Sequence, residues 1–231
     1  MVKRGTQRVD QPEMRVMSRA ATAAYSRDRS YSIVKQIVDI VFGLFLLITF
    51  SPILLVVAVA VYVDSGAPIL YRCRRVGREG RPIKVLKFRT MKDGSHHHLE
   101  ELLTVDEERR LEYIANRKMR DDPRRTRFGP FLRRSSLDEL PQLLNVIAGE
   151  MSLIGPRPYF ADELIGRREA RVLLSVQPGI TGLWQVSGRS DLNFEQRIAI
   201  EVDYVRRRGF TLDLWIAVRT IGAVLSGRGA Y

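Results

Sequence analysis

Two carboxylates close behind two arginines form the part of the chain with the clearest chemical potential. Residues 133–141 read Arg-Arg-Ser-Ser-Leu-Asp-Glu-Leu-Pro, so Asp138 and Glu139 follow Arg133 and Arg134 at the start of an expected helix. The free N–H groups and the dipole of a helix N-terminus attract phosphate. A carboxylate placed there can hold Mg²⁺ on a diphosphate, or it can attack phosphorus directly.

The same stretch also has a purely structural interpretation. Ser136 and Glu139 match the S-x-x-E capping box, in which each side chain bonds a backbone N–H at the start of a helix. Pro141 is tolerated in the first helical turn because an N–H group at that position has no partner within the helix. Spacing alone favours the capping box, although it does not explain the two arginines that precede it.

Three further segments supply cations or tight turns. Arg157 stands between two prolines in Gly155–Pro158, which reduces the entropy lost when the side chain binds an anion. Lys87 and Arg89 alternate along an expected strand and therefore share one face. A Gly-rich loop carries Arg189 and suits a close approach of backbone to ligand. Each segment taken alone also fits a rigid turn or an exposed basic surface.

Several other kinds of site are not indicated. His96, His97 and His98 are adjacent, so their imidazoles cannot all converge on one metal, and no Cys or HExxH pattern accompanies them. The sequence has no phosphate-binding loop, dinucleotide fingerprint or nucleophile elbow. It also has no recognisable nucleic-acid-binding module, so we expect no nucleic-acid partner.

The elements that would position these residues include an apolar segment. Ile40–Val63 carries no charge over 24 residues, and at ~1.5 Å per residue such a helix exceeds a hydrocarbon core of ~30 Å. Pro52 lies near its middle, and both flanks are basic, which selects no spanning orientation. We therefore predict a re-entrant helix–break–helix over residues 37–63. Ser51 or neighbouring protein must then satisfy the carbonyl groups that Pro52 frees. A kinked single span is the alternative.

The rest of the chain predicts a basic N-terminal arm, residues 1–36, and an α/β cytosolic domain with a short sheet and several helices, residues 64–231. Two strands are expected around a turn at Gly77–Gly80. Helices are expected over about 98–116, over 140–149, and, as amphipathic helices at the membrane surface, over about 194–207 and 212–225. The segments 151–158 and 177–191 are expected to be loops.

Composition limits the class of protein. The 231 residues include 38 Lys plus Arg and 26 Asp plus Glu, a net charge of +12, which predicts anionic partners. A single cysteine, Cys73, excludes a disulfide-stapled secreted fold. Two alternatives to an enzyme fit these numbers. One is a membrane-bound adaptor that binds anionic lipid or an acidic partner, and the other is a tethered nucleic-acid binder.

Taken together, the motifs resemble a known family. YRCRRVGREGRPIKVLKFRTM, then RRTRFGPFLRRSSLDELPQLLNVIAGEMSLIGPRP, then QPGITGLWQVSGRS stand in this order behind a Pro-broken apolar segment. This order is similar to that of the bacterial sugar transferases, the monotopic phosphoglycosyl transferases, in their short form. The resemblance covers about residues 33–231.

The resemblance implies an activity and a location. Such an enzyme transfers a sugar-1-phosphate from a nucleoside diphosphate sugar, usually a UDP-sugar, to polyprenyl (undecaprenyl) phosphate and releases UMP. This is the initiating step of exopolysaccharide, O-antigen or glycan assembly. The catalytic domain would face the cytoplasm at the bacterial inner membrane and contact anionic lipid. A homodimer is compatible with the sequence.

The resemblance also implies roles for individual residues. Asp138 would be the nucleophile, would form a phosphosugar intermediate and would bind Mg²⁺, while Glu139 would assist with the metal or with proton transfer. The break of the membrane helix falls on Ser51 and Pro52. The remaining implied positions are the residues that bind substrate phosphates, namely Lys87, Arg133 and Arg157, to which the loop analysis adds Arg189.

Overall fold

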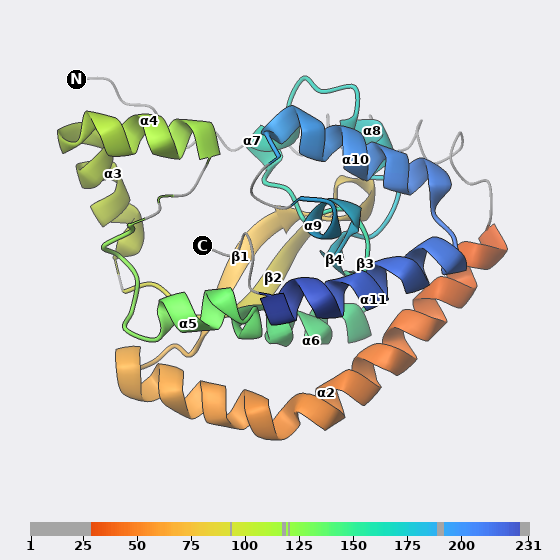
Figure 1. Cartoon of the computed structure of the whole chain (residues 1–231), viewed down its shortest axis with the longest axis horizontal. Helices are drawn as coiled ribbons and strands as arrows, with labels where there is room; N and C mark the ends of the chain where they lie inside the picture. The colour runs from red at the N-terminus through yellow and green to blue at the C-terminus, as the bar shows by residue number, and fades with distance from the viewer. Residues whose placement is uncertain (1–28, 93, 117–118, 120, 189–191, 227–231) are drawn as a thin grey trace.

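The chain folds as a helix-rich body with two short sheets, flanked by one long helix (Figure 1). The structure is a computed structural model, and it describes residues 29–92, 94–116, 119, 121–188 and 192–226. Residues 1–28 of the predicted arm and Arg189 lie outside the described residues. The mixed α/β class is confirmed.

The long helix α2, Arg29–Ser65, contains the predicted apolar segment. By length and composition it is apolar enough to cross a membrane. It continues through Pro52, so a bend within one continuous helix replaces the predicted break, and Figure 1 shows the bend near the middle of α2. Pro52 cannot donate to the carbonyl of Ile48, four residues earlier. The Ser51 hydroxyl donates to that carbonyl at 2.7 Å, as predicted.

The N-terminal part of α2 is bonded to the rest of the protein by polar side chains. The Tyr31 hydroxyl donates to Asp213 Oδ2 at 2.9 Å, and Lys35 Nζ lies 2.9 Å from the same carboxylate. The Ser152 hydroxyl donates to Asp39 Oδ2 at 2.6 Å. Asp39 and Asp213 are buried, so these bonds take the place of bonds to water. They therefore hold the N-terminal part of α2 in one position against the rest of the protein.

The C-terminal end of α2 is bonded to the same body by Arg89. Its guanidinium donates to the carbonyls of Gly66 at 2.6 Å and Ala67 at 3.3 Å, and to the carbonyl of Ser65. A cation is favourable here because the last carbonyls of a helix are unpaired and carry partial negative charge. Arg89 was expected beside Lys87 on one strand face; the strand instead ends at Phe88 and Arg89 turns to α2.

A β-hairpin lies at the centre, as the sequence predicted. β1, Leu70–Val76, pairs antiparallel with β2, Pro82–Phe88, across a short 3₁₀ turn at Arg78–Gly80. The open end of the hairpin packs on α2, where Phe88 joins Val57 and Val61 in a buried cluster. The turn end therefore points away from α2 (Figure 1).

Two helices stand where one was predicted over 98–116. α3, Ser95–Val105, and α4, Glu107–Asn116, are separated at Asp106. The Asp106 carboxylate accepts from the backbone N–H of Arg109 at 3.0 Å and so starts the second helix. The three histidines lie in the first turn of α3, and their side chains are not among those described.

The predicted helix over 140–149 is also divided, into the end of a 3₁₀ helix η2, Leu137–Gln142, and the short helix α6, Leu143–Ile147. Another short helix, α5, Gly129–Arg134, precedes them. Asn145 of α6 bonds the free edge of β2, accepting from Leu86 N–H at 3.0 Å and donating to the Lys84 carbonyl at 2.9 Å. This side chain acts as a short substitute for a third strand.

Two segments predicted as loops contain strands. β3, Ser152–Ile154, pairs in parallel with β4, Gly179–Thr181. The following loop packs closely on β4, since a Cβ atom on Gly155 would lie 2.9 Å from the backbone nitrogen of Gly179. Pro and Gly suggested a loop, yet they allow this close backbone approach.

The helices of the C-terminal part complete the core. Two are the predicted amphipathic helices, α10 at Phe194–Arg207 and α11 at Phe210–Ser226. Three are single turns, namely α7 at Ala161–Leu164, α8 at Ala170–Leu173 and α9 at Leu183–Val186.

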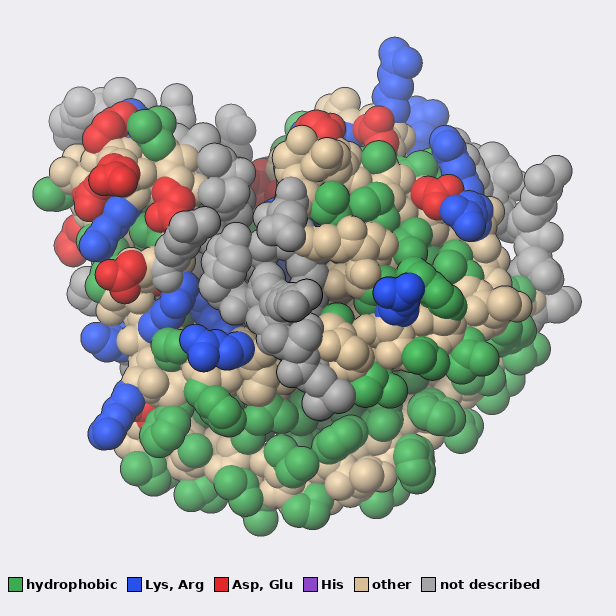
Figure 2. Space-filling view, in the orientation of Figure 1, with side chains coloured by type: hydrophobic (Ala, Val, Ile, Leu, Met, Phe, Trp, Pro, Cys, Tyr) green, Lys and Arg blue, Asp and Glu red, His purple; other side chains and the backbone are tan. Residues whose placement is uncertain are grey.

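An apolar surface runs along one edge of the molecule. α11 exposes Leu214, Trp215, Val218 and Ile221, and α2 exposes large apolar side chains over most of its length. Figure 2 shows these hydrophobic side chains gathered over α2 and α11. Such a surface is typical of a protein that contacts a membrane or another apolar partner.

The bonds made by Arg89 generate the first prediction. Arg89→Met should lower the free energy of unfolding by about 3 kcal/mol, because charged hydrogen bonds to three carbonyls are lost. The midpoint of thermal unfolding in detergent should fall by roughly 6–12 °C. Arg72→Met, at an exposed position of β1, is the control and should change it little. Equal effects of the two substitutions would show that Arg89 does not fasten α2.

Candidate active site

Lys87 and Glu139 join the end of the hairpin to η2. Lys87 Nζ donates to Glu139 Oε1 at 2.5 Å, and both side chains are about one-third exposed. The capping box expected from Ser136 and Glu139 is wrong. Ser136 has a left-handed backbone with φ of 57° and makes no side-chain cap, and Glu139 binds a lysine 52 residues away.

Asp138 is the buried member of the acidic pair. It is 7% exposed, on the first turn of η2. Burial, and after it the neighbouring charge of Glu139, raise its pKa to about 6, while the charges of Lys87 and Arg133 act in the opposite direction. At neutral pH this carboxylate is ionised, and the nearby cations offset only part of its negative charge. Binding of a further cation, or of a group that reacts with the carboxylate and removes its charge, would therefore be favourable here.

Arg133 reaches this cluster from the last turn of α5. Its Nε donates to Thr90 Oγ1 at 3.0 Å, and burial lowers its pKa while the charge of Asp138 opposes that shift. Thr90 is buried and its carbonyl lies against Gly129, where a Cβ atom would come within 2.5 Å of the carbonyl oxygen. Thr90 thus orients Arg133, a role that the Lys-Phe-Arg-Thr-Met segment did not reveal from sequence.

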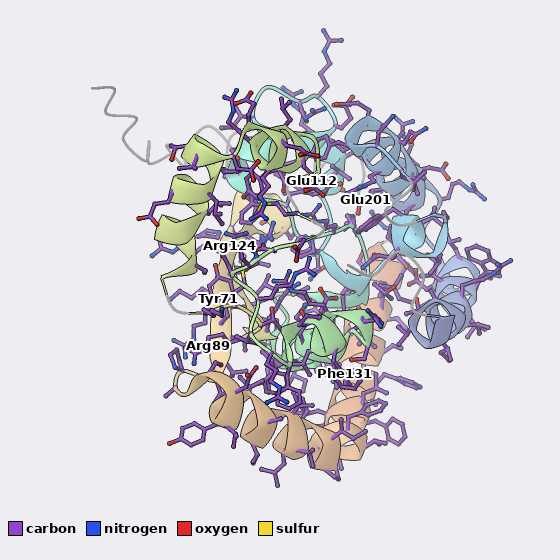
Figure 3. All side chains as sticks on the ribbon, turned by 60° about the vertical axis from the view of Figure 1, so that its left-hand side comes forward. Tyr71, Arg89, Glu112, Arg124, Phe131 and Glu201 are labelled. Atoms are coloured by element: carbon purple, nitrogen blue, oxygen red, sulfur yellow. The ribbon has the colours of Figure 1, made fainter. Side chains whose placement is uncertain are left out.

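A buried ion pair stands behind Arg133. Arg124 donates to Asp122 through Nε at 2.8 Å and through Nη2 at 2.6 Å, a bidentate arrangement. Figure 3 shows Arg124 between the α3–α4 pair and the hairpin. The charges of this pair both act on the pKa of Arg133, which Asp122 raises and Arg124 lowers. No sequence motif indicated Arg124 or Asp122 as site residues, since a charged loop commonly lies on a surface.

Arg157 belongs to a second cluster. Its Nη2 lies 3.7 Å from Glu163 Oε1, and its guanidinium carbon lies 5.8 Å from the centre of the Tyr159 ring. Its backbone N–H donates to Glu201 Oε1 at 2.6 Å. Glu201 is fully buried, and burial raises its pKa to about 7. No sequence pattern indicated Glu201, because a single acid in an amphipathic helix is normally solvated.

The structure therefore brings together four of the predicted site residues, Lys87, Arg133, Asp138 and Glu139. It places Arg157 among other partners, at the turn end of the hairpin. Ser51 and Pro52 lie in α2 and form no part of the cluster.

The acidic pair suits Mg²⁺ only in part. Among the described residues no group of three or more His, Cys, Asp or Glu side chains could hold a metal ion. Mg²⁺ is commonly bound by one or two carboxylates together with substrate phosphates and waters. Asp138 and Glu139 are such a pair, and the repulsion that raises the pKa of Asp138 is one that a divalent cation would relieve.

The chain is similar to several named proteins. Residues 30–227 match the family described as bacterial sugar transferase. The chain is 46% identical over 204 residues to an uncharacterized sugar transferase of Haemophilus influenzae, covering 87% of this chain and 43% of that protein. It is 43% identical over 198 residues to the exopolysaccharide production protein ExoY of Rhizobium meliloti, covering 85% and 88%.

A further relative is longer than this chain. The undecaprenyl-phosphate galactose phosphotransferase of Salmonella typhimurium is 42% identical over 204 residues, which cover 88% of this chain and 43% of that protein. The chain therefore spans less than half the length of the Haemophilus and Salmonella relatives, and most of the Rhizobium relative.

The environment of Asp138 generates the second prediction. Because its pKa is raised from 3.8 to about 6, the folded protein binds this proton more tightly than the unfolded chain does. Stability contributed here is present at low pH and is lost as pH rises through 6. Asp138→Asn should therefore stabilise the protein by about 2 kcal/mol at pH 8, and the gain should disappear near pH 4.

Chemical denaturation at the two pH values measures this difference. Asp203→Asn, at an acid of α10 that pairs with Arg207 on the surface, is the control and should change stability little at either pH. A loss of stability in Asp138→Asn at pH 8 would show that the cations already neutralise the buried carboxylate.

Proposed function

This chain belongs to the bacterial sugar transferase family, and we propose on that premise that it transfers a sugar-1-phosphate from a UDP-sugar to polyprenyl phosphate. The Salmonella relative is named for a phosphotransferase reaction with undecaprenyl phosphate, and the Rhizobium relative for exopolysaccharide production. One observation carries the proposal. A buried carboxylate, Asp138, stands beside a second acid and two cations, next to a long apolar helix.

In the first proposed step, a carboxylate oxygen of Asp138 attacks the sugar-bearing phosphorus of the UDP-sugar. A bond from that oxygen to phosphorus forms, the bond from phosphorus to the oxygen of UMP breaks, and UMP leaves with the electron pair. Attack needs the ionised carboxylate, so activity should decline as pH falls through about 6. The product of this step is a phosphosugar–Asp138 intermediate.

In the second step, an oxygen of polyprenyl phosphate attacks the same phosphorus. The acyl phosphate bond breaks and the Asp138 carboxylate is regenerated. UMP has already left, so one site can serve a soluble donor and a lipid acceptor in turn. Lys87 and Arg133 offset the negative charge of the phosphates in both steps.

Asp138 and Glu139 would hold Mg²⁺ together with phosphate oxygens of the substrate. The ion would supply Lewis-acid stabilisation of the charge that develops on those oxygens. Glu139 is already bonded to Lys87, so its position is set before substrate arrives. Asp138 would therefore contribute to the metal site and also act as the nucleophile.

We also propose that α2 is re-entrant and that the catalytic body rests on the cytoplasmic face of the bacterial inner membrane. Both ends of α2 are bonded to the same body, through Asp213 at one end and Arg89 at the other. Figure 1 shows that body on one side of the bent helix. A helix held at both ends in this way does not suit a single span. The apolar side chains of α11 would contact the lipid surface.

The rival interpretation is an adaptor that binds anionic lipid without catalysis. Its positive charges would need no acid among them, and a buried acid would weaken its binding. The burial of Asp138 between Lys87 and Arg133 therefore favours the enzyme.

Substitution of the proposed nucleophile tests the function. Asp138→Asn should abolish release of UMP from UDP-sugar in the presence of polyprenyl phosphate, because the amide keeps the shape but cannot attack phosphorus. Without lipid, the wild-type protein should carry a phosphosugar adduct on the peptide that contains Asp138, detectable by mass spectrometry. Asp203→Asn is the matched control and should keep full activity. Near wild-type turnover by Asp138→Asn would remove the covalent mechanism.

The topology has a separate test in intact cells. The native Cys73 is buried and makes a poor reporter, so the variants are Arg74→Cys and Ser18→Cys, each in a Cys73→Ser background. A membrane-impermeant maleimide should label neither position until the cells are lysed. Pro52→Ala should straighten α2 and expose position 18 in a fraction of the molecules. Labelling of position 18 in intact cells with Pro52 present would mean that the segment spans the membrane.

A further inference from the structure

The short helix α5 joins the apolar helix α2 to the acid cluster. At the start of α5, the backbone N–H of Phe128 donates to Asp64 Oδ2 of α2 at 2.9 Å. In the middle of α5, Leu132 is 2% exposed and packs with Val57 and Val61 of α2 in one buried cluster. One polar contact and one apolar contact therefore hold α5 against the C-terminal half of α2.

Two faces of α5 meet different surroundings. Arg133 points into the protein, where its Nε donates to the buried Thr90 at 3.0 Å. Phe131, two residues earlier, is 62% exposed, and Phe128 is 42% exposed. Residues two apart on a helix lie about 160° apart around its axis, whereas residues three apart share a face. Phe128 and Phe131 therefore form one exposed apolar face, and Arg133 leaves the helix from the other side.

The apolar face of α5 continues the apolar surface of α2. Figure 3 shows Phe131 on the side of α5 toward α2. The next two elements, η2 and α6, also contact α2, and Leu144 of α6 adds a side chain that is 43% exposed. An apolar surface thus extends from α2 to a helix about 10 Å across, and Arg133 lies on the far side of that helix.

The lipid acceptor of the proposed reaction has one chemical part for each face of α5. Its phosphate is an anion that has to reach the phosphorus held at Asp138, beside Arg133. Its isoprenoid chain is apolar, and it is long enough to pass around one helix and still extend along α2. Ordinary membrane lipids also fit an apolar face, but the reaction does not require their headgroups to enter the acid cluster. The position of Phe131, close to Arg133 in the same helix, favours the acceptor.

We propose that Phe131, with Phe128 beside it, binds the isoprenoid chain of the lipid acceptor where the chain passes around α5 toward Arg133. The inference rests on the proposed function and assigns the chain of the acceptor, as distinct from its phosphate, to a surface. Burial of one exposed phenylalanine ring corresponds to roughly a tenfold gain in affinity or more. Because the first proposed step needs no lipid, Phe131 should affect only the second.

The two proposed steps can be measured separately in detergent micelles. Without lipid, UMP is released once per protein as the adduct forms, and Phe131→Ala should leave the rate of that burst unchanged. With polyprenyl phosphate, the same substitution should raise KM for the acceptor roughly tenfold and change kcat little, because it removes a binding contact only. Phe131→Leu keeps an apolar side chain and should restore most of the affinity. Leu111→Ala is the matched control, since Leu111 is 58% exposed on α4, and it should change neither step.

Two kinetic results would overturn the proposal. An unchanged KM in Phe131→Ala would show that the ring contributes nothing to binding of the acceptor. A slower UMP burst together with the raised KM would show that the substitution disturbs Arg133, so that Phe131 acts on the structure of α5 and not on the lipid.

Crosslinking of the wild-type protein separates the acceptor from the surrounding lipid. Polyprenyl phosphate with a photoreactive group within its first three isoprene units should crosslink to the peptide of residues 128–134. A phospholipid with the same group on its acyl chain, at the same concentration in the same micelles, should crosslink there much less. Equal crosslinking by the two lipids would make this face a general membrane contact and overturn the proposal. Crosslinking by the acceptor in a protein that forms no phosphosugar adduct would contradict the proposed function and leave this binding surface in place.

Discussion

A carboxylate buried next to a second acid needs positive charge close by, and the architecture around Asp138 meets that requirement. The cations come from two segments that are distant in sequence, Lys87 from β2 and Arg133 from α5. Their convergence requires the hairpin, α5 and η2 to meet, and Thr90 fixes Arg133 at that junction. The left-handed turn at Ser136 then directs η2 toward the hairpin. A buried carboxylate with a pKa near 6 is the chemical result.

Three consecutive residues connect this acid cluster to the proposed membrane anchor. Lys87 binds Glu139, Phe88 packs against α2, and Arg89 binds the carbonyls at the end of α2. The site is therefore held at a fixed distance from the apolar helix rather than through a flexible linker. A lipid phosphate at the level of the headgroups would lie near the same end of the hairpin.

Local patterns in the sequence predicted the elements that depend on local forces. The glycine turn and alternation predicted the hairpin, and the helical periodicity predicted α10 at its observed bounds. The acidic pair and its arginine were also evident. The three-residue strands β3 and β4 were missed, because their pairing joins segments 27 residues apart and their Pro and Gly content suggests a loop. The capping box at Ser136 failed because Glu139 meets Lys87, a contact that no local pattern encodes. Glu201 was missed for the same reason, since burial of a charge depends on the whole fold.

Transfer of a sugar together with its phosphate is the central claim, and the fate of the two phosphorus atoms tests it most directly. UDP-sugar carrying different labels on its two phosphorus atoms is incubated with the protein, Mg²⁺ and polyprenyl phosphate, and the aqueous and lipid phases are separated. The sugar-bearing phosphorus should enter the lipid phase, and UMP, with the other label, should stay in water. Recovery of UDP with both labels in water would mean that sugar alone is transferred, and would contradict the proposed mechanism.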